Sequence, residues 1–222
     1  MARNQTTAAP LIPPRPTLPR LRKAAAICQA CDLWKRGRQT VFGEGKPNAQ
    51  AMFVGEQPGD HEDIVGRPFV GAAGKLFDKA LERAGIDRAE VYVTNVVKHF
   101  KWVAQERGKR RIHKKPRDSE INACRPWLDA EIAVVKPNIL VCLGATAAQA
   151  LLGKDFRVSK HRGERIDSPL APYVTATVHP SSVLRAQDQE SRRAEMEAFV
   201  NDLKKVKTWM VSTASLTERR AS

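Results

Sequence analysis

Short apolar segments recur along the chain, and each is bounded by glycine, proline or polar residues. Segments of this length and composition, with many β-branched residues, are typical of strands buried inside a sheet. The pattern therefore predicts four strands, at residues 51–55, 91–96, 139–143 and 173–178.

Segments with apolar residues at helical spacing lie between and after these strands. They cover residues 72–84, 118–135, 145–152 and 192–206. Alternation of strands with helices predicts an α/β fold in which helices cover a mostly parallel sheet. Ligands of such sheets bind beyond the carboxyl ends of the strands, so the loops that directly follow the strands are where chemistry is expected.

Both ends of the chain lack this apolar pattern. Residues 1–18 hold several prolines and predict a disordered arm, and residues 208–222 predict a polar tail, which leaves one domain at 19–207. The start of the chain has no apolar stretch typical of a secretory signal, and the longest apolar runs are too short to span a bilayer. We therefore expect a soluble, cytoplasmic monomer.

The charge balance predicts the kind of partner. Lysine and arginine number 38 against 24 acidic residues, which gives a net charge of +14. Such an excess favours a polyanionic partner, because each contact with a phosphate releases condensed counterions. Nucleic acid is favoured over an anionic membrane surface, since no basic amphipathic helix with an apolar face stands out.

The cysteines form one short-spaced pair and two isolated positions. Cys28 and Cys31 make a C-x-x-C pair, whereas Cys124 and Cys142 stand far downstream. Structural disulfides are uncommon in a cytosolic chain, which leaves three interpretations. A cysteine inside a buried strand is commonly an ordinary core thiol. The set could also bind zinc, although zinc sites usually show two short-spaced pairs, or hold a [4Fe–4S] cluster, whose ligands are often scattered.

Polar and aromatic residues follow the first predicted strand. The sequence there reads GEQPGD and then GRPFVGAAG, which places Glu56, Asp60 and Phe69 in one loop region. Neither the P-loop pattern nor G-x-G-x-x-G is present, so a phosphate cradle is not indicated. A carboxylate pair with an aromatic ring fits a pocket for a flat base, although an ordinary turn with a buried phenylalanine explains the same residues.

Single polar residues end two further strands. Asn95 offers a donor and an acceptor together, the pairing that reads a nucleobase edge. His179 can donate to a carbonyl oxygen that gains charge as a bond breaks. Taken alone, such an asparagine is more often a turn residue and such a histidine more often structural. In a parallel sheet, however, all three loops converge at one edge.

These loops together resemble the uracil-DNA glycosylase superfamily, most closely its cluster-containing family 4. The resemblance rests on GEQPG, GRPFVGAAG, TNVVKHF and HPSSVLR in this order, with the four cysteines, and covers residues 26–205. It implies a three-layer α/β/α sandwich around a mostly parallel four-stranded sheet, and uracil-containing DNA as the partner. It also implies a structural [4Fe–4S] cluster as cofactor, held by Cys28, Cys31, Cys124 and Cys142.

The same resemblance implies roles for individual residues. Phe69 would stack on the extruded uracil, and Asn95 would bond its polar edge and reject cytosine. His179 would donate to the uracil O2 and stabilise the departing anion. The resemblance further assigns Gly55, Glu56, Gln57 and Asp60 to the uracil pocket and the catalytic set, and Ser181, Ser182 and Arg185 to the DNA backbone.

Two departures from ordinary family 4 enzymes indicate a narrower class. Gln57 stands where those enzymes have a small residue, and it could crowd the space of an attacking water. Residues 107–117 form an added basic segment, which by itself predicts only a solvated, phosphate-binding loop. KRRIH within that segment, combined with GEQPG, resembles the UdgX class, whose members become covalently joined to DNA at the uracil site.

The resemblance to UdgX implies that His113 is a nucleophile. A neutral imidazole can attack C1′ of the sugar once uracil departs. The neutral alkylated imidazole that remains is a poor leaving group, so the bond should persist. Glu56 would orient His113 or take its proton, and Arg111 would anchor the loop. The residues expected to contact DNA in this segment are Lys109, Arg110, Arg111, Lys114 and Lys115.

Three hypotheses for function follow from the sequence. The first is excision of uracil, with single strands preferred, followed by a covalent bond between His113 and C1′. The second is a conventional glycosylase that releases abasic DNA and turns over. The third is a cluster-bearing nucleic-acid-binding module without catalysis. The combination of Glu56, Asn95 and His179 at three strand ends argues against the third.

Overall fold

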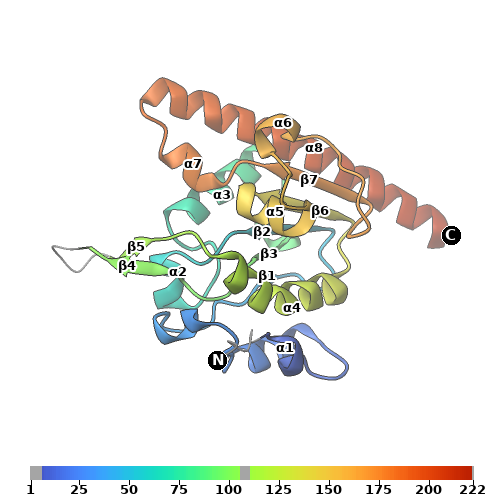
Figure 1. The fold of residues 1–222 in the computed structure, drawn as a ribbon. Helices are drawn as coiled ribbons and strands as arrows, with labels where there is room; N and C mark the ends of the chain where they lie inside the picture. Colours follow the sequence, from blue (N-terminus) through green and yellow to red (C-terminus); the bar gives the residue numbers. More distant parts are fainter. Residues whose placement is uncertain (1–6, 106–110, 222) are drawn as a thin grey trace.

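A central five-stranded sheet organises the molecule (Figure 1). The computed structural model describes residues 7–105 and 111–221, and only the backbone for 214–221. Four strands are parallel, as predicted, and the fifth is a short antiparallel edge strand. The sheet order is β1 (Glu44–Gly45), β3 (Tyr92–Asn95), β2 (Ala51–Gly55), β6 (Ile139–Leu143) and β7 (Tyr173–Thr177). The edge strand was not predicted, because two partly exposed residues carry no apolar pattern.

Helices cover both faces of the sheet, which confirms the predicted α/β fold. On one face lie α1 (Leu18–Ala25), α4 (Asp118–Val135) and α5 (Ala145–Leu152), and on the other α3 (Ala72–Arg83) and α8 (Gln189–Ala221) (Figure 1). The short helices are α2 (Asp60–Val65), α6 (Val158–His161), α7 (Pro180–Leu184), η1 (Ala9–Leu11), η2 (Asp32–Lys35) and η3 (Arg88–Glu90).

Alternate residues of each strand enter opposite cores. In β2, Met52 packs in the core that contains Trp127 of α4, whereas Phe53 packs in the core that contains Phe199 of α8. This alternation follows from the two-residue period of a strand. Both faces of the central strands are therefore apolar, which explains their continuous hydrophobic sequence.

Some described residues near each end of the chain are held by contacts with the domain. Within the expected arm, Ala8 is buried and its amide donates to the carbonyl of Ala123 at 2.9 Å. Within the expected tail, α8 continues without a break, Trp209 stacks on Tyr173 with ring centroids 5.6 Å apart, and Met210 is buried. Prolines and polar residues removed the periodic pattern from these segments, but a few apolar contacts suffice to hold them.

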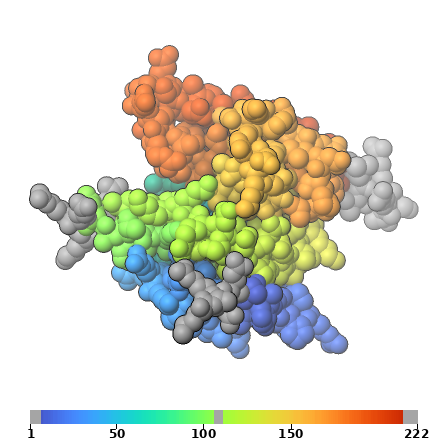
Figure 2. Space-filling view, in the orientation of Figure 1, coloured from blue at the N-terminus to red at the C-terminus, as the bar shows by residue number. Residues whose placement is uncertain are grey.

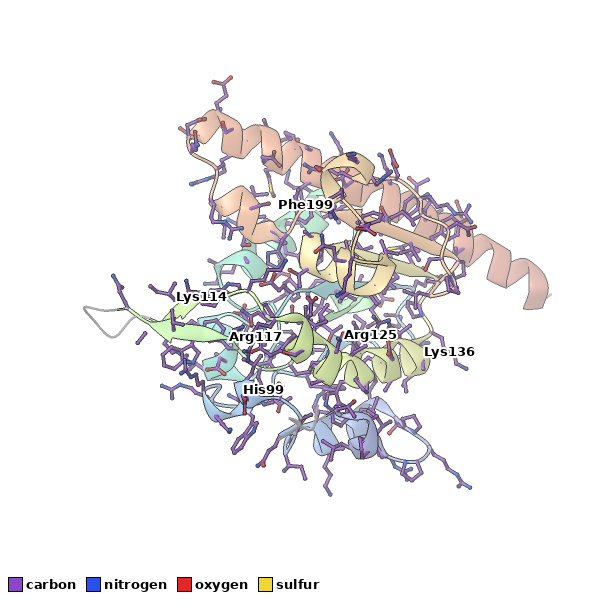
Figure 3. All side chains as sticks on the ribbon, viewed as in Figure 1. His99, Lys114, Arg117, Arg125, Lys136 and Phe199 are labelled. Carbon is purple, nitrogen blue, oxygen red and sulfur yellow. The ribbon has the colours of Figure 1, made fainter. Side chains whose placement is uncertain are left out.

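A two-stranded hairpin projects from one side of the domain. It consists of β4 (Trp102–Ala104) and β5 (Arg111–His113), which pair antiparallel. Figure 2 shows this green region at the edge of the molecule, and Figure 3 labels Lys114, which directly follows β5. Lys109 and Arg110 lie outside the described residues. Within the described part of the chain, no helix combines the length and the apolarity needed to cross a bilayer.

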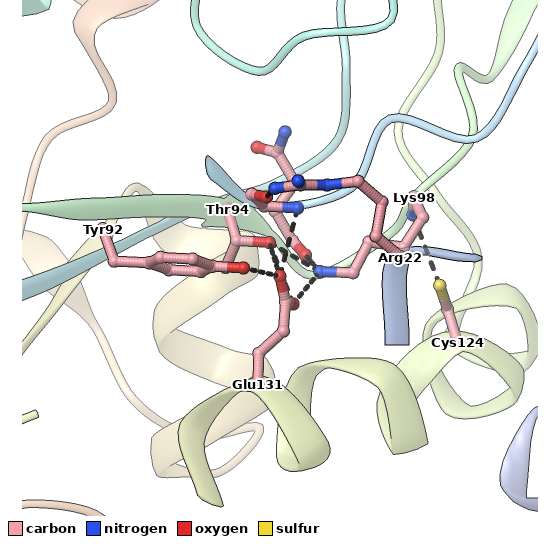
Figure 4. Close-up of polar contacts among 8 residues, drawn as sticks. Arg22, Tyr92, Thr94, Lys98, Cys124 and Glu131 are labelled. Carbon is pink, nitrogen blue, oxygen red and sulfur yellow. Dashed lines mark hydrogen bonds and ion pairs between the residues drawn. The ribbon is translucent and has the colours of Figure 1, made fainter. Parts of the chain in front are cut away.

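A buried ion pair lies between α4 and the end of β3 (Figure 4). The Lys98 ammonium donates to Glu131, to the Thr94 hydroxyl at 2.6 Å and to the Asn95 carbonyl at 2.7 Å. Glu131 also accepts from the Tyr92 hydroxyl at 2.8 Å. Both charged side chains are fully buried, so each depends on the other for its compensation.

Replacing only one member of this pair should destabilise the domain strongly. The Lys98→Met substitution leaves the Glu131 carboxylate buried without its cation, for which we expect a loss of about 3–5 kcal/mol in unfolding free energy. Denaturant titration measures this loss. The control is Lys35→Met, which breaks an exposed pair with Asp32 and should change stability little. Equal effects of the two substitutions would contradict the assigned role.

Candidate active site

The loops after β2, β3 and β7 converge at one edge of the sheet. Gly55 marks the point where two of the predicted site residues meet. A Cβ atom added to Gly55 would lie 2.4 Å from the Asn95 Oδ1 and 2.8 Å from a ring carbon of Phe69. Only a glycine allows this close approach. The ring of Phe69 also lies 6.2 Å from the ring of His179, measured between centroids.

The backbone holds Phe69 in an uncommon conformation. Its φ is +57°, which is costly for a residue with a side chain, so the surroundings must enforce it. The carbonyl of Phe69 packs so closely on Gly74 that a Cβ there would lie 1.8 Å from the carbonyl oxygen. The Glu62 carboxylate accepts from the amides of Gly59 at 3.1 Å and Gly71 at 2.8 Å, and thereby ties together the two loops that flank Phe69.

His179 is buried as a neutral hydrogen-bond donor. Its Nδ1 lies 3.1 Å from the Ser181 amide, which donates to it, and 2.8 Å from the Ser181 hydroxyl. An amide can only donate, so Nδ1 carries the lone pair and Nε2 carries the proton. Burial, assisted by the nearby Arg185 and His113 charges, lowers the pKa of His179 to about 4. The ring is therefore uncharged at neutral pH and offers its Nε2 proton.

A cavity of about 810 Å³ opens beside His179. Predicted site residues from three separate segments line it: Glu56, Gln57, His113, Lys115, His179, Ser181, Ser182 and Arg185. Gly55, Phe69 and Asn95 are not in its lining and meet behind it, at the strand ends. The structure thus brings the predicted nucleophile, His113, and the predicted hydrogen-bond donor to uracil, His179, into one cavity, although they are far apart in the sequence.

The His113 ring enters this cavity from the hairpin. Its Nε2 lies 2.7 Å from the Gln57 Nε2 and 3.3 Å from the Glu56 Oε1. The side chain is about half exposed, at 51%. Burial lowers the pKa of His113, the Glu56 carboxylate opposes that shift, and the Arg185 charge adds to it. The balance favours a neutral imidazole.

Gln57 binds both strands of the hairpin. Its Oε1 accepts from the Lys101 amide at 2.9 Å, and its Nε2 donates to the Lys114 carbonyl at 2.9 Å. These two backbone groups determine which end of the carboxamide is oxygen. The Gln57 Nε2 also lies 3.4 Å from the Lys101 carbonyl and 2.7 Å from the Nε2 of His113, and because an amide nitrogen only donates, a hydrogen bond to His113 requires that its Nε2 accept through the lone pair. Gln57 thus positions the hairpin, and its contact with His113 favours the tautomer in which Nε2 carries the lone pair.

Arg111 anchors the hairpin on the opposite side. Its guanidinium forms ion pairs with Asp60 and, at 2.5 Å, with the fully buried Asp63, and lies over the ring of Phe100 at 5.3 Å. Asp60 is therefore engaged by Arg111 and lines a separate cavity of about 470 Å³, which also includes His113. Lys114 is exposed beside the hairpin (Figure 3).

The four cysteines share one side of the sheet. Cys28, Cys124 and Cys142 belong to the core between α4 and the sheet, and Cys31 packs against it. Burial is the main cause that raises the pKa of Cys31 to about 11 and those of Cys124 and Cys142 to about 12. Neighbouring thiols add to the shifts of Cys31 and Cys124. Across the described residues, however, no group of three or more His, Cys, Asp or Glu side chains is assembled that could hold a metal ion.

The loop after β6 also belongs to the cavity, and its residues were not predicted from the sequence. Leu143, Gly144, Ala145 and Thr146 line the main cavity, and the Thr146 hydroxyl donates to Glu56. The rule that ligands bind beyond the carboxyl ends of parallel strands could have identified this loop. Its small residues carry no conspicuous chemistry, which is why the pattern of reactive side chains did not point to it.

Comparison with known proteins gives a consistent result. The family model described as "Uracil DNA glycosylase superfamily" matches residues 42–204. The chain is similar to a type-4 uracil-DNA glycosylase of Thermotoga maritima, at 38% identity over 82% of this chain and 89% of the relative. It is also similar to a type-4 enzyme of Archaeoglobus fulgidus, at 33% over 81% and 86%, and to a type-5 enzyme of Thermus thermophilus, at 26% over 83% and 93%.

The protonation state of His179 can be measured directly. Because burial holds the pKa of its ring at about 4, the imidazole resonances should shift with an acid midpoint near that value. A His179→Gln variant assigns the signals. Since the unfolded ring binds a proton more readily, folding stability should also fall as the pH drops below about 6.5. A midpoint of about 6.5, the value of a free imidazole, would contradict the assignment.

Proposed function

The chain belongs to the uracil DNA glycosylase superfamily, and we propose that it excises uracil from DNA and then bonds His113 to the sugar left behind. The observation that carries this proposal is the position of the His113 Nε2, directed into the same cavity as His179 and 3.3 Å from the Glu56 carboxylate. A histidine with only a phosphate-binding role would not require a carboxylate and a carboxamide at one ring nitrogen.

Recognition of uracil rests on the residues that meet at Gly55. The Phe69 ring offers a stacking surface, and the Asn95 amide lies beside it at the end of β3. An amide side chain can donate to the uracil O4 and accept from N3–H, whereas cytosine presents the opposite pattern. The buried Lys98–Glu131 ion pair holds Asn95 in place, because the Lys98 ammonium donates to the main-chain carbonyl of Asn95.

Bond cleavage depends on the neutral His179. The N-glycosidic bond breaks with its electron pair passing to uracil, and the negative charge that develops on O2 is stabilised by the Nε2 proton of His179. This proton is available because Ser181 occupies Nδ1. The sugar becomes an electron-poor oxocarbenium ion at C1′, which reacts with the first nucleophile that reaches it.

His113 then competes with water for C1′. The hydrogen bond from Gln57 to the His113 Nε2 must break as C1′ approaches, and the lone pair that it occupied then forms the new bond. The resulting imidazolium releases its Nδ1 proton to solvent, and the uracil anion takes up a proton in exchange. The net reaction joins protein to DNA and consumes no water. The Glu56 carboxylate beside Nε2 stabilises the positive charge while the bond forms.

DNA is held by the basic rim of the cavity. Ser181, Ser182 and Arg185 lie at its edge, where hydroxyl and guanidinium groups can bind backbone phosphates. Lys115 lines the same cavity from the hairpin side, and Lys114 is exposed next to it. With a net charge of +14, binding should weaken as the salt concentration rises. Lys109 and Arg110 would extend this surface but lie outside the described residues.

The second candidate is a conventional glycosylase that turns over. The type-4 names of several relatives fit it equally well. The partial exposure of His113 also leaves a path by which water could reach the sugar. The two candidates differ in the fate of C1′, not in the recognition or the release of uracil.

A denaturing gel distinguishes the two candidates. After incubation with a uracil-containing oligonucleotide, the wild-type protein should give a shifted band that survives heat and detergent. The His113→Ala variant should lose this band, still release uracil and regain turnover, because water then reaches C1′. The matched control is His161→Ala, at an exposed position bonded to Glu164, which should form the adduct like the wild type. Absence of the band in the wild type would leave the conventional enzyme.

We also propose that the four cysteines hold a [4Fe–4S] cluster. The four cysteines lie in or against the same core, which supports this proposal. When the cluster binds, the thiols would have to lose their protons and move closer together. Such a cluster would tie the segment after α1 to α4 and β6, with no part in cleavage. Protein purified without oxygen should contain iron and acid-labile sulfide in equal amounts, and Cys142→Ser should lose both. Zinc without sulfide would disprove the cluster.

A further inference from the structure

Thr146 is buried beside Glu56, at the start of α5. Its side chain is reached by little solvent, since the residue is 5% exposed. Its hydroxyl donates to the Glu56 Oε2. The other carboxylate oxygen, Oε1, faces the His113 Nε2 at 3.3 Å. The three side chains therefore form a chain of contacts, from Thr146 after β6, through Glu56 after β2, to His113 at the end of β5.

We propose that Thr146 is a positioning residue that aims the Glu56 carboxylate at His113 and so favours imidazole over water at C1′. The inference rests on the proposed covalent reaction and adds a third member to it. Thr146 touches neither the sugar nor the base in this scheme. It acts only through Glu56.

The hydrogen bond from Thr146 matters because few other described contacts restrain the Glu56 side chain. Its side chain is 21% exposed, and a glutamate has several rotatable bonds through which the carboxylate can turn toward solvent. A hydrogen bond to a carboxylate is among the stronger side-chain contacts and fixes one oxygen. With Oε2 bound by Thr146, Oε1 is the oxygen left to face the imidazole.

The turn before α5 lies close to both His179 and Glu56. Gly144 has a φ of +88°, and a Cβ there would lie 2.9 Å from the His179 Cβ, so the turn packs directly against the proposed acid. Thr146 lies two residues further on, against Glu56. One rigid turn thus contacts the residue that orients the nucleophile and the residue that assists departure of uracil.

The Glu56 carboxylate acts in the second half of the reaction, when His113 bonds to C1′. As the Nε2 bonds to C1′, positive charge moves onto the imidazole ring, and a carboxylate held 3.3 Å away stabilises it. An attacking water molecule is stabilised less by the Glu56 carboxylate, unless it occupies the position of the His113 Nε2. A misdirected Glu56 should therefore lower adduct formation more than uracil release.

The test is the partition of product between adduct and free abasic DNA. The Thr146→Val substitution removes the hydroxyl and nearly preserves the shape. It should lower the ratio of adduct to free abasic product by about tenfold or more, while uracil release falls by less. Thr146→Ser keeps the hydroxyl and should restore the ratio. The matched control is Thr175→Val, because Thr175 is also buried and its hydroxyl has no hydrogen-bond partner among the described residues.

The outcomes separate this inference from the proposed function. If the wild type forms the adduct and Thr146→Val partitions like the wild type and Thr175→Val, Thr146 has no positioning role. If Thr146→Val and Thr146→Ser lose adduct and uracil release equally, the hydroxyl acts on the whole site and the inference is again wrong. If the wild type forms no adduct, the covalent reaction itself is disproved, and the role of Thr146 with it.

Discussion

His113 reaches the cavity because one carboxamide binds the hairpin on both of its strands. Gln57 is 6% exposed and forms partly buried hydrogen bonds with the backbone of Lys101, just before β4, and of Lys114, just after β5, so movement of either strand would break one of them. The same carboxamide donates to the His113 Nε2 and leaves that atom with a lone pair. Position and reactivity of the proposed nucleophile thus depend on one side chain.

The fold supplies a rigid frame for these contacts. Asn95 ends β3, and Glu56 and His179 follow β2 and β7. The faces of these strands are packed in separate cores, and such strands have little freedom to shift. The Lys98–Glu131 pair adds a fully buried charge contact at the end of β3, directly behind Asn95. Apolar packing places the strand ends, and buried polar groups then fix the last residues of each strand.

The basic character of the protein also affects the chemistry inside the cavity. Arg185, at the rim, lowers the pKa of both His113 and His179, in addition to the larger effect of burial. A positive surface suited to binding phosphates therefore helps to keep both imidazoles neutral. That state is the one required of a donor to uracil and of a nucleophile toward C1′.

The sequence by itself determined the four parallel strands and the longer helices between and after them, because the two-residue and helical periods of apolar residues report directly on which face each segment buries. It also placed Glu56, Asn95 and His179 at one edge of the sheet, since the carboxyl ends of parallel strands lie at the same edge. Only the tertiary structure decided which atoms meet. Gln57 and His113 are 56 residues apart, and Glu56 and Thr146 are 90 apart. Contacts over such separations depend on how helices and loops pack in three dimensions, and no local pattern encodes that packing.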